Sequence, residues 1–132
     1  MGAHPRDISL EELCREVERI MPVRTQLRAR PMDIEFALDP SRKQYHSTEL
    51  LRALLEQNST TEFKLLGITP FDLFVPVLTF VFGQAQVNNR AAVFSTFRLH
   101  NEFYGLPHAG DLLTNRSLKE ALHELGHTFG LR

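Results

Sequence analysis

The sequence predicts an α/β domain of the α+β type, in which a mixed, twisted sheet packs against helices that include one at the C-terminus. Three segments carry apolar residues at helical spacing, and the segments between them show alternating or continuous apolar runs. The resulting order is helix, strands, helix, strands, helix, for which one sheet covered by helices is the natural arrangement. A length of 132 residues, with 42% hydrophobic residues and no internal repeat or linker, fits a single domain.

Two helices are predicted in the first half of the chain. Ser9 and Glu12 have the spacing of a capping box, in which each side chain bonds to the backbone N–H of the other residue. Apolar residues then recur at helical spacing until Pro22, namely Leu10, Leu13, Val17 and Ile20. A second helix is predicted to begin at its cap, Ser47, and to bury a stripe formed by Leu50, Leu51, Leu54 and Leu55.

Strands are predicted from alternation and from apolar runs, and turns from Pro, Asn, Asp and Gly. The predicted strands are residues 23–30, 33–38, 63–69, 73–82 and 91–99. Turns are predicted at Asp39-Pro40-Ser41 and at Pro70, and a hairpin turn at Asn88-Asn89. Residues 101–115 are predicted to form a loop.

The charge balance and the cysteine count exclude several classes of protein. Lys and Arg number 15 against 16 Asp and Glu, so nothing in the net charge of -1 favours a nucleic acid or an anionic membrane as partner. The longest apolar run, residues 71–82, is shorter than the roughly twenty residues that a membrane-spanning helix needs. The one cysteine, Cys14, cannot form an internal disulfide, so we expect a cytoplasmic protein. The sequence leaves the oligomeric state open.

The last helix is predicted to begin near Thr114 or Asn115, where Ser117 and Glu120 stand at capping-box spacing. An apolar stripe is expected to hold this helix against the core. The stripe consists of Leu118, Leu122, Leu125 and Phe129.

The last helix also carries the motif His123-Glu124-x-x-His127. With His123 at 0° and about 100° per residue, His127 lies at about 40° and Glu124 at about 100°, away from the apolar stripe. Two imidazoles at positions i and i+4 can bind one zinc ion, and the glutamate beside the first can act as general base on the bound water. The sequence therefore predicts His123 and His127 as metal ligands and Glu124 as the catalytic residue. The alternative is a surface helix with two histidines and a salt-bridging glutamate.

The stretch His123-Glu124-x-x-His127-x-x-Gly130 is similar to the opening of the metzincin zinc signature, H-E-x-x-H-x-x-G-x-x-H. Five upstream segments match one metzincin branch as an ordered set, namely residues 41–48, 67–69, 72–76, 80–85 and 93–99. With these segments the sequence resembles the archaemetzincins from about residue 8 to its end. The resemblance implies a metzincin-like upper subdomain whose C-terminal helix carries the active site.

The resemblance also implies that residues 1–132 are a single partial catalytic domain. The signature would place its third zinc-ligand histidine at residue 133, so we expect a chain truncated before that ligand, with His100 or His108 as candidate substitutes. The family's cysteine-rich segment, which resembles a second, structural zinc site, is expected to be absent. An extended substrate is expected along an edge strand, although the same residues also suit a core strand and turn. These expected substrate-binding residues are Phe82, Gly83, Gln84 and Ala85.

The function implied by the resemblance is that of a zinc-dependent metallopeptidase, which hydrolyses peptide bonds in a peptide or protein substrate. Metal-activated water would attack the substrate with Glu124 as general base, and one catalytic Zn²⁺ would be held by His123 and His127. The alternative is a non-catalytic folded fragment, or a module that binds a peptide or partner without metal. A metal-dependent hydrolase of another substrate shares the same zinc site.

Overall fold

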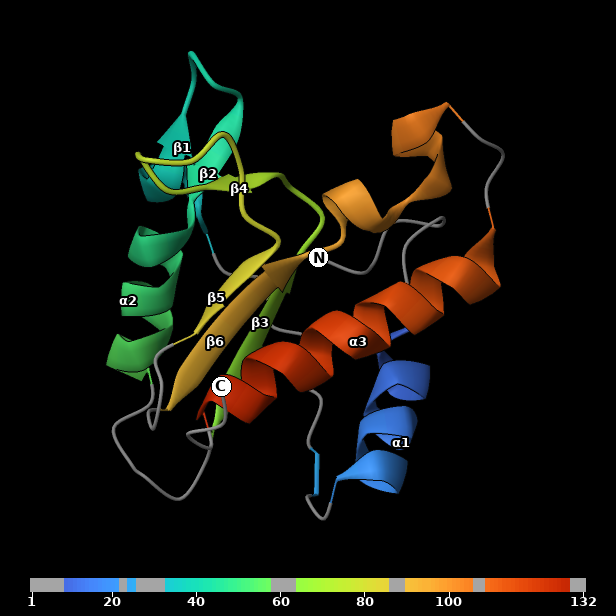
Figure 1. The fold of residues 1–132 in the computed structure, drawn as a ribbon. Helices are drawn as coiled ribbons and strands as arrows, with labels where there is room; N and C mark the ends of the chain where they lie inside the picture. The colour runs from blue at the N-terminus through green and yellow to red at the C-terminus, as the bar shows by residue number, and fades with distance from the viewer. Residues whose placement is uncertain are drawn as a thin grey trace.

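Strand β6 (Ala91–Ser95) is the central strand of the computed structural model, whose described residues are 9–21, 24–25, 33–57, 64–85, 90–105 and 109–128 (Figure 1). On one side β6 pairs in parallel with β3 (Leu65–Thr69), and on the other it pairs in antiparallel fashion with β5 (Gly83–Ala85). All five residues of β6 are buried, since helices cover both faces of this sheet. Within the part of the chain that the structure describes, β5 is an edge strand.

Helices α1 (Leu10–Ile20) and α3 (Gly110–Thr128) cover one face of this sheet, and α2 (Ser47–Gln57) covers the other (Figure 1). Because side chains alternate along a strand, neighbouring residues of β6 enter different apolar clusters. Phe94 packs with residues of α1 and α3, whereas Val93 packs with residues of α2. No helix in the described ranges is long and apolar enough to cross a membrane.

A second, smaller sheet lies beyond the ends of these strands and has the order β1-β2-β4 (Figure 1). Strand β2 (Gln44–His46) pairs in antiparallel fashion with β1 (Leu38–Asp39) and in parallel with β4 (Leu73–Phe74). An antiparallel bridge between Leu73 and Val81 joins β4 to the segment that leads into β5. Three short 3₁₀ helices complete the described elements: η1 (Glu35–Ala37), η2 (Phe97–Leu99) and η3 (Asn101–Tyr104).

The predicted fold class is confirmed, with the described strands divided between two three-stranded sheets instead of one. The first two helices are also confirmed. Ser9 caps α1 by accepting a hydrogen bond from the Glu12 N–H at 3.3 Å, and α1 ends at Ile20. Helix α2 begins at Ser47, and the hydroxyl that was expected to cap it lies 2.5 Å from the amide oxygen of Gln84 in β5.

Two predicted turns are confirmed by hydrogen bonds from side chains to the backbone. The Asp39 carboxylate accepts bonds from the N–H groups of Ser41 and Arg42, at 3.0 and 3.2 Å. At the Pro70 turn, the Thr69 hydroxyl oxygen accepts a bond from the Phe71 N–H at 3.2 Å. Such local bonds stabilise a chain reversal where no strand ladder is available.

Three predicted strands were wrong in extent. Of residues 33–38, those at 35–37 form η1, and only the last residue enters β1. The run 73–82 contributes β4 and then turns at Pro76, because proline lacks the N–H group that a continuing ladder requires. The run 91–99 leaves the sheet after Ser95 and continues as η2, since the Ser95 hydroxyl oxygen accepts the Phe97 N–H at 3.0 Å and turns the chain.

Two further predictions concern segments that lie wholly or mostly outside the described residues. The predicted strand at 23–30 lies outside the described residues except at 24–25, which belong to no strand. The hairpin turn at 88–89 is likewise outside them, although β5 and β6 pair in the antiparallel manner that a hairpin requires.

The start of the last helix was predicted too late. Helix α3 begins at Gly110, and the Leu113 N–H already donates to the Ala109 carbonyl at 3.1 Å. Ser117 therefore lies inside the helix, where it is buried, and is not its cap. Residues 101–115, predicted as a loop, contain η3 and the first turn of α3.

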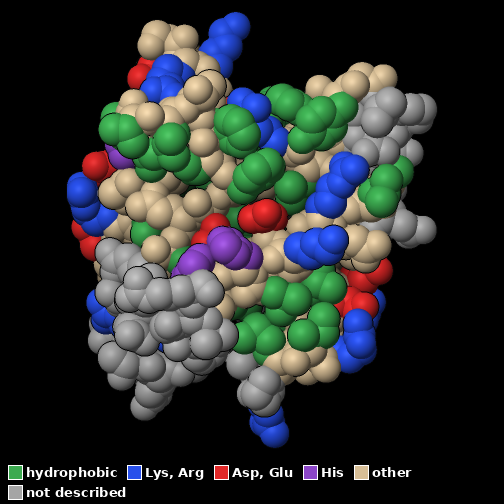
Figure 2. Space-filling model, in the orientation of Figure 1, with side chains coloured by type: hydrophobic (Ala, Val, Ile, Leu, Met, Phe, Trp, Pro, Cys, Tyr) green, Lys and Arg blue, Asp and Glu red, His purple; other side chains and the backbone are tan. Residues whose placement is uncertain are grey.

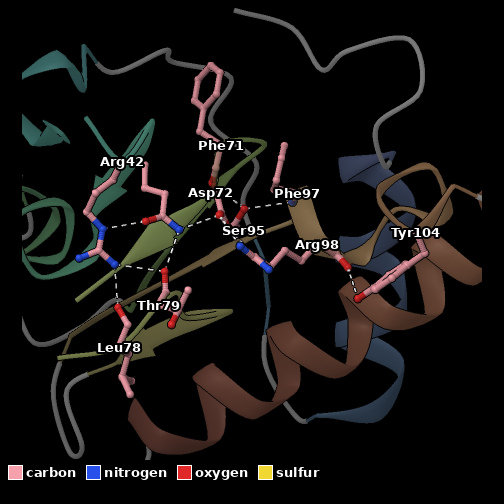
Figure 3. Close-up of polar contacts among 10 residues, drawn as sticks. Arg42, Phe71, Asp72, Leu78, Thr79, Ser95, Phe97, Arg98 and Tyr104 are labelled. Carbon is pink, nitrogen blue, oxygen red and sulfur yellow. Dashed lines mark hydrogen bonds and ion pairs between the residues drawn. The ribbon is translucent and has the colours of Figure 1, made fainter. Parts of the chain in front are cut away.

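Asp72 joins the segment between β3 and β4 to η2, the segment that follows β6 (Figure 3). Its carboxylate accepts two hydrogen bonds from Arg98, both at 2.9 Å, and one from the Gln44 side-chain amide at 2.8 Å. Gln44 and Arg42 also donate to the Thr79 carbonyl, at 2.9 and 3.1 Å. These bonds fix the loop between β4 and β5, which forms one wall of the cleft described below.

We predict that Asp72→Asn lowers the free energy of unfolding by about 3 kcal/mol, because it leaves the Arg98 guanidinium without its anionic partner in a mostly buried position. The side chains of Asp72 and Arg98 are 9% and 20% exposed. In the control Glu49→Gln, an ion pair to Arg52 is lost where the side chains are 38% and 61% exposed, so the cost stays below about 1 kcal/mol. Urea denaturation measures both values, and equal costs would contradict the prediction.

Candidate metal and catalytic site

The two histidines of the motif lie side by side on the last turns of α3. Their Nε2 atoms are 3.2 Å apart and their ring centroids 4.5 Å apart. Two nitrogen ligands at 2.0–2.1 Å from a tetrahedral zinc ion lie about 3.3–3.4 Å apart. The separation of His123 and His127 therefore fits two ligands of one zinc ion, and it also fits a hydrogen bond between the rings in the metal-free protein.

Glu124 completes a group of three side chains that suits a metal ion. One ligand atom from each of His123, Glu124 and His127 lies within 4.8 Å of the others. His123 is exposed and His127 half-buried, whereas Glu124 is only 4% exposed. The helix thus turns one carboxylate toward the sheet and keeps the first imidazole open to solvent.

Gly83 at the start of β5 makes room for that buried carboxylate. A Cβ atom at this position would collide with Oε2 of Glu124 and would lie 2.6 Å from the Val93 carbonyl oxygen. Since real Cβ atoms almost never approach another heavy atom so closely, only glycine lets α3 and β5 come together here. The close contact between strand β5 and helix α3 therefore depends on the absence of a side chain at Gly83.

The burial of Glu124 changes its proton affinity. Burial, together with the charge of the neighbouring Glu120 carboxylate, raises the pKa of Glu124 to about 7. Burial also raises the pKa of Glu120, and the charge of His123 partly offsets that rise. A carboxyl group with a pKa near neutrality is well suited to accept and return protons during a reaction.

The metal-binding group opens into a cleft of about 460 Å³ between β5 and α3. Its lining residues come from both sides: Val81, Phe82, Gly83, Lys119, Glu120, His123 and Glu124. Figure 2 shows histidine side chains in the middle of this face of the molecule, with acidic and basic side chains beside them. The metal-binding side chains are therefore accessible to a molecule in solution.

The expected substrate-binding residues fall on the rim of this cleft and beyond it. Phe82 and Gly83 line the cleft, and β5, which holds Gly83, Gln84 and Ala85, is the edge strand described above. The Gln84 amide oxygen accepts a bond from the Thr48 hydroxyl of α2 at 3.1 Å, so this side chain lies on the opposite face of the sheet. At Gln84, only the backbone is oriented to meet a molecule in the cleft.

The predicted apolar stripe is not the most buried face of α3. Leu118 and Leu125 contact the core as predicted, but they are only partly buried. The most buried face is formed by Leu113 and by small or polar residues that follow it at intervals of three or four positions, namely Ser117, Ala121, Glu124 and Thr128. The small residues at this spacing were the available signal, since they let a helix approach a sheet.

The two candidate substitute ligands do not join the group in the part of the chain that is described. His100 follows η2 and is not within the group of side chains that could share an ion with His123. His108 lies outside the described residues. The described ligands for a metal at this site are therefore the residues of the motif.

Comparison with known proteins gives one family. The sequence profile of peptidase family M54 matches residues 6–132. The archaemetzincin of Methanocaldococcus jannaschii is 45% identical over 96 residues, which are 73% of this chain and 51% of that protein. The archaemetzincin of Halobacterium salinarum is 38% identical over 98 residues, or 72% of this chain and 56% of that protein. The chain thus spans about half the length of these relatives.

Solved structures give the same result for the fold. A zinc-dependent peptidase from Methanocorpusculum labreanum superposes with a TM-score of 0.76 at 29% identity, covering 91% of this chain and 73% of that one. The archaemetzincin of Methanopyrus kandleri superposes with a TM-score of 0.72 at 33% identity, covering 99% and 69%. The fold of the described residues is therefore one found in zinc peptidases.

We predict that Gly83→Ala lowers the free energy of unfolding by about 1–3 kcal/mol, since the new methyl group overpacks the contact between β5 and α3. The matched control is Gly67→Ala in β3, where the nearest atom, 2.9 Å away, is the mobile end of the Leu54 side chain. That control should cost less than about 1 kcal/mol. In an E124A background, Gly83→Ala should cost less than in the wild type, because part of the clash is gone. Chemical denaturation of the four variants measures this, and an unchanged cost in the E124A background would contradict the role given to Glu124.

We predict that Glu124 makes the metal-free protein less stable as the pH rises. The pKa of this group is about 7 in the folded protein and 4.5 at its ordinary value, so burying the ionised form costs free energy that first appears above about pH 4.5 and is complete above about pH 7. In EDTA, the stability of Glu124→Gln relative to wild type should therefore rise between about pH 5 and about pH 8, by at most about 3 kcal/mol. The exposed control Glu56→Gln should show no such rise. A constant difference for Glu124→Gln at the two pH values would refute the prediction.

Proposed function

This chain belongs to peptidase family M54, and from that premise we propose that it carries the ligand-bearing helix and upper cleft wall of a zinc-dependent peptidase. The observation that carries the proposal is the pair of imidazole nitrogens 3.2 Å apart, beside a buried carboxylate at the floor of an open cleft. A surface helix with incidental histidines would not bury Glu124 against a glycine of the neighbouring strand.

We propose that Nε2 of His123 and Nε2 of His127 hold the catalytic zinc ion. Catalytic zinc sites have three protein ligands and an open position, so two imidazoles leave one protein ligand to be supplied. A third histidine at position 133 of a longer chain would supply it, as the resemblance to archaemetzincins implies. A second, structural zinc would belong to the part of the relatives' length that this chain does not span.

Zinc, when bound, supplies a Lewis acid that lowers the pKa of water and polarises a substrate carbonyl. The remaining chemistry belongs to the chain. The carboxylate of Glu124 would accept a proton from the attacking water and return it to the leaving amine. Gly83 keeps this carboxylate against β5, and the open side of His123 leaves room for the substrate.

Strand β5 is the proposed docking place for the peptide. An edge strand presents backbone N–H and C=O groups that can pair with an extended chain, which is a common way to bind peptides. Phe82 and Gly83 stand at the cleft, and Gln84 and Ala85 continue the same edge. The substrate class is therefore a peptide or an extended segment of a protein.

The single cysteine agrees with a reducing compartment, which supports a cytoplasmic location.

We predict that His123→Ala and His127→Ala abolish stoichiometric zinc binding, since each removes one of the proposed ligands. Zinc content per chain after dialysis is measured in this chain and in a longer one that continues through a third histidine, where we expect tighter retention. His100→Ala is the matched control and should leave zinc content unchanged. If His123→Ala retained as much zinc as the wild type in both lengths, the proposed site would be wrong.

We predict that Glu124→Gln keeps its zinc and lowers peptide hydrolysis by about 10²–10⁴-fold, since it removes the general base and leaves both imidazoles in place. A quenched fluorescent peptide mixture incubated with the zinc-loaded longer chain measures the rate, with Glu56→Gln as the exposed control. Wild-type protein that holds zinc and binds the peptides without cutting them would favour the non-catalytic alternative instead.

A further inference from the structure

The cleft at the metal-binding group does not end at Glu120. A second hollow continues from it along α3 and shares three lining residues with it, Phe82, Lys119 and Glu120. The second hollow adds Arg98, Leu99, Tyr104 and Arg116. We call this continuation the basic cleft. It gives the site a second compartment that the family motif does not define.

The basic cleft is lined by more positive than negative charge. Arg98, Arg116 and Lys119 face it, together with one carboxylate, that of Glu120. Asp72 stands behind Arg98 and offsets one of the positive charges. Basic side chains therefore predominate in the lining of this cleft, which suits an anion.

Both arginines of the basic cleft are fixed by the fold before any ligand arrives. Arg98 is held by its two hydrogen bonds to Asp72 (Figure 3). Its guanidinium also lies over the rings of Phe80 and Phe103, at 3.8 and 4.8 Å from the ring centroids. Arg116 donates to the Leu99 carbonyl at 2.8 Å. Side chains that are already ordered lose little entropy on binding, which favours recognition of an anion.

The basic cleft lies within reach of a peptide bound at the metal group. Lys119 stands one helical turn before His123, and Arg116 stands seven residues before it, or about 10 Å along the helix axis. Consecutive residues of an extended peptide advance about 3.3 Å, so the cleft is reached by residues close to the bond that is cut. Phe82 and Tyr104 provide exposed ring surface for the apolar part of such residues.

We propose that the basic cleft binds a carboxylate of the substrate peptide, so that the protein prefers peptides with an acidic side chain, or with their C-terminal carboxylate, near the bond that is cut. This inference rests on the proposed function, because it assigns the substrate class of that same site. A carboxylate suits this mainly basic lining, and the ammonium of the exposed Lys119 completes the set of donors. Lys119 is thus a specificity-determining residue, and the two arginines set its electrostatic surroundings.

The experiment uses the 132-residue chain without zinc, so that its result does not depend on catalysis. N-acetyl-glutamate amide, N-acetyl-glutamine amide and N-acetyl-alanine with a free carboxyl group are titrated separately, and backbone amide NMR shifts near Arg98, Arg116 and Lys119 are followed. We expect the glutamate probe or the free-acid alanine probe to bind at least about threefold more tightly than the glutamine probe. The stronger of the two identifies the source of the carboxylate.

The charge reversal Lys119→Glu should abolish this preference, whereas the matched reversal Arg52→Glu on the exposed face of α2 should leave it unchanged. Equal binding of all three probes, or a preference that survives Lys119→Glu, would overturn the inference. Loss of zinc binding in the earlier experiment would refute the proposed peptidase site without altering the probe preference, so the two failures are distinguishable.

Discussion

The close approach of α3 to β5 and β6 is the contact on which the rest of the site depends. It is possible because Gly83 has no side chain where Glu124 and the backbone of β6 approach it, and because Ser117 and Ala121 are small on the buried face of the helix. A larger residue at Gly83 would separate the two elements. The separation would expose Glu124 to water and move the histidines away from the edge strand. Packing at this contact therefore governs the chemistry as well as the stability of the fold.

The electrostatic character of the site follows from the same contact. Because Glu124 is enclosed, the pKa of its carboxyl group is raised toward neutrality, and a nearby cation would have a strong effect on it. The other wall of the cleft is held differently, through the hydrogen bonds of Asp72, Gln44 and Arg98. One wall thus depends on close packing at Gly83 and the other on a buried ionic network, so substitutions on the two sides should disturb the cleft independently.

Much of the fold and the centre of the site could be predicted from local patterns. The cap at Ser9 and the turn at Asp39 were predictable because neighbouring residues in the chain make those contacts. The histidine pair was predictable because helical spacing fixes it. The close-packed face of α3 and the role of Gly83 were not, since both depend on residues that are distant in sequence. The start of α3 was missed because Gly110 is a poor helix former, and tertiary packing outweighs that preference.

The three-residue length of β5 also has a consequence for how copies of the chain behave in concentrated solution. An open strand edge is a template for any extended backbone, including the same edge of another molecule, and long edges lead to aggregation. With Gly83, Gln84 and Ala85 as the residues of this ladder within the described part of the chain, two copies would gain few hydrogen bonds by pairing edge to edge there. A peptide that also fills the adjoining cleft would make more contacts than a second copy of the chain paired at this edge. The short strand thus favours transient occupancy by a peptide over permanent self-association.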